Sequence, residues 1–288
     1  MRQTGRWQDL NEVFENRNRP TCHVEQRGVC GMKDYGRLAS YPVGVTPPVR
    51  RPSSGRTRAG ARPVAAASGK RLAPVVYEML KERLLEGTYQ AGERLSVETL
   101  KTEFDVSKQP VMEALHRLAA DGLVEIVPQV GCRVVRFQPQ EVTDFYAIFG
   151  AMEGAVAGVA ALRRTEDQLG DLEQVNQEIG DLANNPDPAA RSHGYRILNR
   201  EFHATVHNMA HSDVIADISQ RMWDLSDLLI NTSGVPRPLA TVTGERHDDH
   251  DRIINALRAG DPDAARIEME EHITSTVEII HTESKAIS

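Results

Sequence analysis

The sequence is poor in aromatic residues and in cysteine. Phe, Trp and Tyr make up 5% of the 288 residues, whereas hydrophobic residues make up 40%, a balance that favours a helical protein rich in Ala and Leu. The three cysteines, Cys22, Cys30 and Cys132, are too few for a disulfide framework, and the first two lack the short spacing of a zinc knuckle. We therefore expect the protein to work in a reducing cytoplasm.

Long apolar segments are also absent. The chain has no uninterrupted run of about 18 apolar residues, the length that a membrane-spanning helix needs. Its N-terminus lacks the apolar core of a secretory signal. The sequence therefore predicts neither a membrane span nor a leader peptide.

Charge is distributed unevenly behind a net charge of −7. Residues 1–71 contain 14 Lys and Arg against 5 Asp and Glu, residues 72–137 contain 8 against 10, and residues 138–288 contain 12 against 26. A strongly acidic segment is repelled by DNA phosphates. Any contact with nucleic acid is therefore expected from the first half of the chain.

Residues 1–70 show no sustained helical or strand periodicity. From residue 42 onward they are rich in Pro, Gly, Ser, Arg and Ala, which predicts a disordered basic tail. The tail is a candidate for a non-specific DNA-binding arm. Alternatively, translation starts at Met32 or later, and the first residues are not part of the protein.

Residues 71–137 carry the signals of three helices followed by a hairpin. The first helix is expected to end at Gly87, and Ser96 and Ser107 are placed to cap the next two. Three helices and a two-stranded wing form a winged helix-turn-helix, whose third helix enters the DNA major groove. The expected strands are 123–127 and 132–137. The apolar face of the first helix is expected to comprise Val75, Val76, Met79, Leu80 and Leu84.

Residues 138–288 alternate helical segments with short breaks and contain no strand signals. We therefore predict a mainly α protein, in which the winged helix-turn-helix is followed by an all-α antiparallel helical bundle. The expected helices cover approximately residues 140–163, 165–184, 188–210, 212–232, 239–259 and 262–284.

Several motifs, taken in order, resemble the GntR family of bacterial transcription regulators, in the FadR-like branch with an FCD ligand-binding domain. The first domain contains GERLSVETL, VSKQPVMEAL and RLAADGLVEIVPQVG. The second contains YAIFGAMEGAVAGVAAL, NREFH, and HDRIINALRAGD followed by MEEH. The resemblance covers about residues 72–284. It implies a DNA-binding regulator whose bundle, residues 138–288, binds a ligand and dimerises.

Four side chains of the second domain have the spacing of one ligand set. Asn199 and His203 lie four residues apart, on one helical face. His250 and His272 each lie eleven residues from Asp261, or ~16 Å from the turn along their own helices. In an antiparallel hairpin their imidazoles are therefore level. The resemblance implies the same four positions as metal ligands, with an Asp where this chain has Asn199.

Three histidines and one oxygen donor suit Zn, Ni or another borderline divalent ion. Because the Asn199 amide brings no negative charge, we expect the affinity or the choice of metal to differ from that of relatives with Asp. The alternative is that the histidines are ordinary packing residues.

The expected effector is a small metabolite, of which a carboxylate is the natural class because an anion completes the coordination of a bound cation. In the family, an Arg often lies four residues before a Glu in the first bundle helix. Here that Glu is Glu153 and the earlier position is Phe149, so an arginine clamp is missing there. The expected effector pocket comprises Phe149, Glu153, Arg196, Arg200, His207 and Trp223.

The resemblance places the DNA contacts at the starts of the second and third helices and in the wing. Positions that usually carry Arg hold Glu98, Lys108 and Met112 here. Arg forks onto guanine, whereas Lys is a point charge and Met offers only apolar contact, for example to a thymine methyl. Met112 is therefore expected to shift the sequence preference, unless it packs against the partner domain. The predicted DNA-binding residues are Arg94, Glu98, Lys101, Ser107, Lys108, Gln109, Met112, Arg117, Gln129 and Arg133.

These features predict a homodimeric, metabolite-responsive repressor that reads an inverted repeat. Two alternatives remain open from the sequence. One is a metal sensor in which the ion itself is the signal. The other is a helical-bundle metalloenzyme that uses His203, His250 and His272 for hydrolysis or oxygen chemistry.

Overall fold

The computed structural model describes residues 72–127 and 131–287, apart from the side chains of Asp213 and Ile287. The predicted tail over residues 1–70 and the wing residue Gln129 lie outside the described residues.

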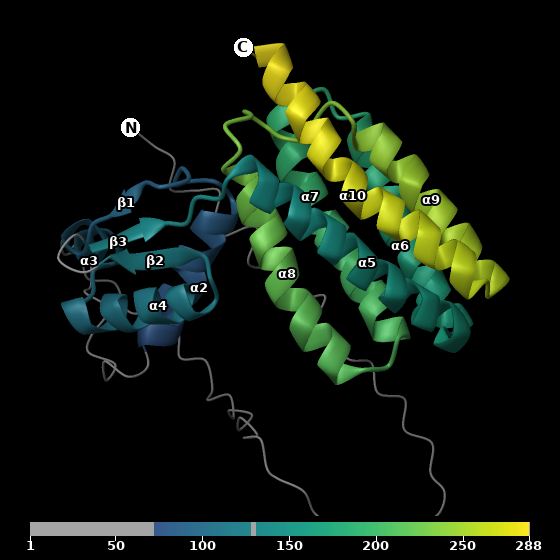
Figure 1. Cartoon of the computed structure of the whole chain (residues 1–288), viewed down its shortest axis with the longest axis horizontal. Coiled ribbons are helices and arrows are strands. Elements are labelled where there is room, and N and C mark those ends of the chain that lie inside the picture. Colours follow the sequence, from purple (N-terminus) through teal and green to yellow (C-terminus); the bar gives the residue numbers. More distant parts are fainter. Residues whose placement is uncertain (1–71, 128–130, 288) are drawn as a thin grey trace, which may run out of the picture. The chain divides into compact units, whose positions relative to one another are not determined.

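The first domain contains three helices and a small antiparallel sheet (Figure 1). The helices are α2 (Leu72–Leu85), α3 (Val97–Phe104) and α4 (Lys108–Ala120). The strands are β1 (Arg94–Leu95), β2 (Val124–Val127) and β3 (Gly131–Val134), in the order β1-β3-β2. The sequence predicted the β2–β3 hairpin and missed β1, because a strand of two residues shows no periodicity. In the sheet, Arg94 pairs with Arg133 and Leu95 with Cys132.

Local side-chain chemistry fixes the ends of α3. The Ser96 hydroxyl accepts a hydrogen bond from the Thr99 backbone N–H at 3.3 Å, which satisfies one of the free donors at the helix start. Asp105 ends the helix in the left-handed region, with φ 52°. Ser107 occupies the corresponding position before α4, yet its side chain makes no capping hydrogen bond. The Ser107 hydroxyl is therefore not used by its own helix.

The core of this domain forms where α2 packs against α4. Leu80, Leu84, Val111 and Leu118 are fully buried there. The prediction for the α2 face was partly wrong, because Val75 and Met79 are 52% and 45% exposed. Val76, Leu80 and Leu84 are buried as predicted, and the whole buried stripe comprises Ala73, Val76, Tyr77, Leu80, Leu84 and Leu85.

The second domain is a helical bundle in which α5 runs beside α10, and α6 packs on α7 and α9 (Figure 1). Its helices are α5 (Pro139–Arg163), α6 (Glu166–Ala183), α7 (Pro188–Met209), α8 (Asp213–Asn231), α9 (Thr243–Ala259) and α10 (Pro262–Ile287). Each lies close to a segment predicted from the sequence, because Pro, Gly and Asp mark the breaks.

Helix α5 is the central apolar element of the bundle. Within the described ranges, it is the one helix long and apolar enough to cross a membrane, with a mean hydropathy of 1.6 over 18 residues, half of them buried. The sequence prediction relied on uninterrupted apolar runs and therefore did not detect this helix. Gly150, Gly154 and Gly158 lie one turn apart on it and bring its backbone close to α10. This close packing identifies α5 as a core helix of the bundle.

The α9–α10 turn sets the register of the two helices that carry His250 and His272. Gly260 ends α9 with φ 66°, a left-handed conformation that glycine adopts without strain. Asp261 Oδ1 then accepts hydrogen bonds from the backbone N–H groups of Asp263 and Ala264, at 3.1 and 3.0 Å. These contacts start α10 directly after the turn, so the two helices run antiparallel from a fixed point.

The α5–α10 contact leads to a stability prediction. A Cβ added at Gly154 would lie 2.8 Å from the backbone oxygen of Arg266, whereas one added at Gly170 on α6 meets nothing within 4 Å. We expect Gly154→Ala to lower the free energy of unfolding by about 1–3 kcal/mol, as overpacked sites do. Gly170→Ala should raise it by ~0.5–1 kcal/mol because Ala favours helix. Urea denaturation followed by circular dichroism measures both, and equal effects would refute the tight contact.

Candidate metal centre and nucleic-acid interface

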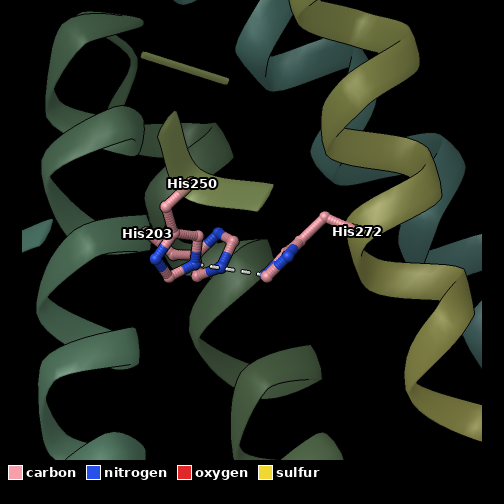
Figure 2. A group of neighbouring side chains, drawn as sticks. All are labelled: His203, His250 and His272. Atoms are coloured by element: carbon pink, nitrogen blue, oxygen red, sulfur yellow. Dashed lines mark hydrogen bonds between the residues drawn. The ribbon is translucent and has the colours of Figure 1, made fainter. Parts of the chain in front are cut away.

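Three histidines from three helices meet inside the bundle. His203 lies on α7, His250 on α9 and His272 on α10, and Figure 2 shows their rings converging. Their candidate ligand nitrogens lie within 4.8 Å of one another, and all three residues are buried. The Nε2 atoms of His250 and His272 are 3.3 Å apart, which confirms the level placement expected from their equal distance to Asp261.

Burial keeps these imidazoles in the form that binds metals. Desolvation, reinforced by the neighbouring histidines, lowers the pKa of His203 and of His250 well below the ordinary value. Desolvation also lowers the pKa of His272, although a hydrogen bond to Asp249 opposes this shift. Neutral imidazoles offer a lone pair to a cation, so the charge state of the group suits a divalent ion.

Several nitrogens of this group have no hydrogen-bond partner in the protein. Both ring nitrogens of His203 and Nδ1 of His250 are buried without a hydrogen bond. Burying one polar atom without a hydrogen bond lowers the stability of the fold by about 1–3 kcal/mol. Three such nitrogens at one place therefore indicate that a ligand binds there. A borderline divalent ion fits this nitrogen-rich donor set, and when bound it would supply a positive charge that attracts anions.

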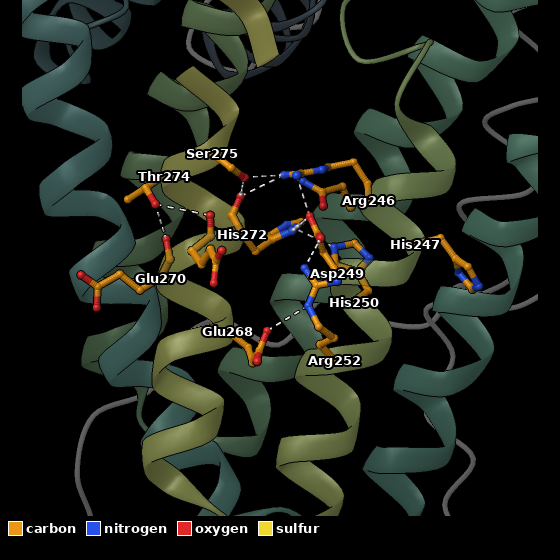
Figure 3. Close-up of polar contacts among 12 residues, drawn as sticks. Arg246, His247, Asp249, His250, Arg252, Glu268, Glu270, His272, Thr274 and Ser275 are labelled. Atoms are coloured by element: carbon orange, nitrogen blue, oxygen red, sulfur yellow. Dashed lines mark hydrogen bonds and ion pairs between the residues drawn. The ribbon is translucent and has the colours of Figure 1, made fainter. Parts of the chain in front are cut away.

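Asp249 orients the His272 ring through a contact with its Nδ1 atom, as Figure 3 shows. Its Oδ2 lies 3.3 Å from Nδ1 of His272, so a proton on Nδ1 leaves the Nε2 lone pair toward the other histidines. Arg246 and Arg252 hold the carboxylate at 2.6 and 2.5 Å. Burial disfavours ionised Asp249, but the His272 hydrogen bond and the two guanidinium groups outweigh it, and the pKa of Asp249 is lowered.

Asn199 makes a contact of its own on α7. Its Oδ1 accepts a hydrogen bond from the Tyr195 hydroxyl at 3.1 Å. An amide oxygen has two lone pairs, so this bond leaves one acceptor site. The role of Asn199 as a metal ligand stays a prediction.

Four of the six residues expected in the effector pocket gather beside His203. Glu153 Oε2 lies 2.8 Å from Nε2 of His207 and 3.7 Å from Nδ1 of His203. The Trp223 ring centroid lies 4.2 Å from that of His203 and 5.0 Å from that of Phe149. The Glu153 side chain is 1% exposed, which is rare for a carboxylate and requires partners.

The other two expected pocket residues, Arg196 and Arg200, are paired with carboxylates of the protein. Arg200 donates to Asp227 at 2.8 Å and to Asp224 at 2.9 Å. Arg196 pairs with Glu82 and Glu86 of α2 and lies 3.7 Å from Asp227. Both guanidinium groups are therefore balanced by carboxylates of the protein, and their part in binding an effector stays a prediction.

Sequence reasoning missed two buried polar residues, Asp249 and Ser219. Asp249 precedes His250 in the charged run ERHDDHDR, so a search for carboxylates beside metal ligands would have found it. Ser219, one turn before Trp223 on α8, carries no comparable signal. The Ser219 hydroxyl and the Trp223 indole nitrogen are both buried without a hydrogen bond.

The start of α4 presents several of the predicted DNA contacts at the surface. Ser107, Lys108 and Gln109 are exposed there, and Met112 is half-buried. Gln109 donates to Glu113 at 3.0 Å, one turn further along the helix. This end of α4 therefore offers one cation and two polar side chains to a nucleic acid.

Most of the other predicted DNA contacts have intramolecular partners. Lys101 pairs with Glu98 at 2.7 Å, and Arg133 pairs with Glu125 at 2.6 Å. The Arg117 guanidinium lies over the Tyr77 ring, 3.9 Å from its centroid. These contacts are at the surface, where such pairs are weak and can be exchanged for phosphates. Arg94 projects from β1, where Gly131 of β3 lies close to its guanidinium.

Comparison with known proteins agrees with this architecture. Residues 72–134 match the family of bacterial regulatory proteins called gntR, and residues 144–275 match the FCD domain. The E. coli HTH-type transcriptional repressor GlaR is 24% identical over 71% of this chain and 93% of its own length. The E. coli Exu regulon transcriptional regulator is 28% identical over 71% of this chain and 83% of its own.

Solved structures share the fold. E. coli McbR/YncC has a TM-score of 0.62 at 18% identity, covering 74% of this chain and 98% of its own. A GntR transcriptional regulator from Rhodococcus sp. RHA1 has a TM-score of 0.56 at 20% identity, covering 76% and 98%. The family consists of DNA-binding regulators, so the metalloenzyme alternative is not retained. The chain belongs to the GntR family of transcription regulators and carries an FCD domain.

Proposed function

We propose that the protein is a cytoplasmic repressor, dimeric on an inverted-repeat operator, that responds to a carboxylate held at a divalent ion between His203, His250 and His272. The observation that carries this proposal is the group of buried imidazole nitrogens without partners, inside a domain of the FCD family. A dimer with two-fold symmetry reads two half-sites of opposite orientation. The repressor name of one relative supports the direction of the response.

An organic effector is favoured over a response to the ion alone. A divalent ion would satisfy histidine nitrogens, but it cannot accept a hydrogen bond from the Trp223 indole N–H. That donor is buried and unpaired beside His203. A ligand with an oxygen atom next to the ion would satisfy it.

A chain of contacts runs from His203 to the DNA-binding domain. The Trp223 ring packs on His203, and the Arg200 guanidinium lies 5.7 Å from the Trp223 ring centroid. Arg200 binds Asp224, which also binds Lys81 of α2 at 2.5 Å. Because α2 packs against the recognition helix α4, we infer that occupancy of the centre is transmitted through this ion network.

The metal prediction concerns stability. An ion that binds only the native state at 100 times its Kd raises the free energy of unfolding by about 2.7 kcal/mol. We expect Zn²⁺ to produce a rise of this order in the wild type and none in His272→Ala, measured by thermal unfolding with and without a chelator. His281→Ala is the control, because this residue is exposed on α10 and should leave the response intact. Equal Zn²⁺ stabilisation of His272→Ala would contradict the site.

Two substitutions in α4 separate the overall affinity for DNA from the preference for particular bases. Lys108→Ala should weaken binding to all DNA sequences. The slope of the logarithm of the binding constant against the logarithm of the salt concentration should fall by ~1, which corresponds to one lost phosphate contact. Met112→Arg should raise the preference for guanine at one position by roughly 10- to 100-fold, since Arg forks onto O6 and N7. Selection from random DNA followed by salt titration measures both.

Lys285→Ala is the control, because it removes the same charge from the acidic bundle at an exposed position. An unchanged guanine preference in Met112→Arg would show that residue 112 does not face the bases.

The coupling prediction uses amide hydrogen exchange with Zn²⁺ as the probe. Zn²⁺ should slow exchange around the three histidines and also in α2. Arg200→Gln should keep the first effect and reduce the α2 effect by about fivefold, the scale of a typical coupling energy. Arg258→Gln, which loses a surface pair with Glu173 and a hydrogen bond to Asn255, should behave as wild type. A full α2 response in Arg200→Gln would refute transmission through this residue.

A further inference from the structure

We propose that a second divalent ion, of the manganese class, binds on α9 at His247, Asp248 and Asp251. One ligand atom from each of these residues lies within 4.8 Å of the other two. In Figure 3 the His247 side chain points away from His272, so this cluster is separate from the three buried histidines. The inference goes beyond the proposed function and does not depend on it.

Two contacts with α6 fix the His247 ring. Its Nδ1 lies 3.0 Å from the backbone oxygen of Asn176. Because a carbonyl oxygen only accepts, Nδ1 carries a proton there and Nε2 is the nitrogen left for an ion. Gly180 provides the space for the ring, since a Cβ at that position would lie 3.0 Å from the His247 Cε1 atom. The imidazole is therefore held by one nitrogen, as metal-bound imidazoles are.

The separation between the ring and Asp251 suits a shared ion better than a direct bond. His247 Nε2 lies 3.6 Å from Asp251 Oδ2, which is too long for a hydrogen bond. Two donors that bind one divalent ion at about 2.0–2.3 Å lie ~3–3.5 Å apart. Asp248, exposed at the position after His247, completes a set of one imidazole and two carboxylates.

Asn176 is a buried polar residue beside this cluster. It is 2% exposed, and its Nδ2 donates to Asp251 Oδ1 at 2.7 Å and to the His247 backbone oxygen at 3.3 Å. Its Oδ1 is buried without a hydrogen-bond partner. A half-turn of the amide exchanges these two atoms and brings Oδ1 to the Asp251 carboxylate. Two oxygen atoms repel at that distance unless a cation binds both, so an ion would give the unpaired oxygen its partner.

The donor set selects the class of ion. With the Asn176 amide, the cluster offers three oxygen donors for one imidazole, and its two aspartates are exposed to water, which can supply further ligands. Oxygen-rich sites suit Mn²⁺, whereas the three buried imidazoles of the central group suit Zn²⁺. Because Mn²⁺ binds nitrogen ligands more weakly than Zn²⁺, it should not displace an ion from the centre. An ion at the cluster would link α9 to α6.

The test is a Mn²⁺ titration of the full-length protein loaded with one equivalent of Zn²⁺, followed by electron paramagnetic resonance of free Mn²⁺. We expect the wild type to bind one Mn²⁺ per subunit. His247→Ala and Asp251→Asn each change a ligand and should lower the Mn²⁺ affinity by at least about tenfold, and Asn176→Ala by roughly 10- to 100-fold. His281→Ala, at an exposed position of α10, is the control and should bind Mn²⁺ as the wild type does.

The two ligand variants guard against a loss of folding. Asp251→Asn keeps the size of the side chain, so it covers the case in which His247→Ala disturbs the packing on Gly180. Circular dichroism confirms that each variant tested is folded.

The outcomes separate this inference from the proposed function. A wild type that leaves Mn²⁺ free, or wild-type affinity in the folded His247→Ala and Asp251→Asn variants, would overturn the site and leave the cluster as a surface ion pair. Wild-type affinity in Asn176→Ala would overturn the part of the amide. His272→Ala should lose Zn²⁺ and still bind Mn²⁺, so a failure of the central site is seen in the Zn²⁺ content alone.

Discussion

The burial of imidazole nitrogens without hydrogen-bond partners is the constraint on which the rest of the structure depends. His203, His250 and His272 come from three helices and meet where water does not reach their nitrogens. Such an arrangement is unfavourable for folding unless something else binds those nitrogens. The hydrogen bond of Asp249 to His272, and the arginines that hold Asp249, then make sense as the support of a ligand set.

The same constraint explains why charge is so closely balanced around the centre. The arginines described around it have carboxylate partners, and Glu153 contacts His207 and His203. An ion held by the imidazoles would also face Glu153. The network of Arg200, Asp224 and Lys81 connects that region to α2.

Much of the fold follows from local chemistry that the sequence displays. Helix breaks at Pro, Gly and Asp predicted the bundle helices closely, and the equal spacing from Asp261 predicted that His250 and His272 are level. Strand β1 was not predictable, because two residues carry no period. The face of α2 was predicted in part, because Val75 and Met79, which are exposed, satisfy helical periodicity as well as the buried residues Val76, Leu80 and Leu84 do.

The site was less predictable than the fold, for a physical reason. Which carboxylate pairs with which arginine depends on tertiary contacts. Arg196 and Arg200 were expected at the effector, and in the structure they form ion pairs with carboxylates of α2 and α8. Glu153 on α5 and His207 on α7 are 54 residues apart in the sequence, and only packing shows that they meet at 2.8 Å.

X-ray absorption spectroscopy of the Zn²⁺-loaded protein tests the central claim most directly. Three imidazole nitrogens at about 2.0–2.1 Å, completed by oxygen donors, are the coordination that this account predicts. The imidazole contribution should fall by one in His250→Ala. A spectrum with fewer than three imidazoles in the wild type, or with sulfur from Cys132, would contradict it.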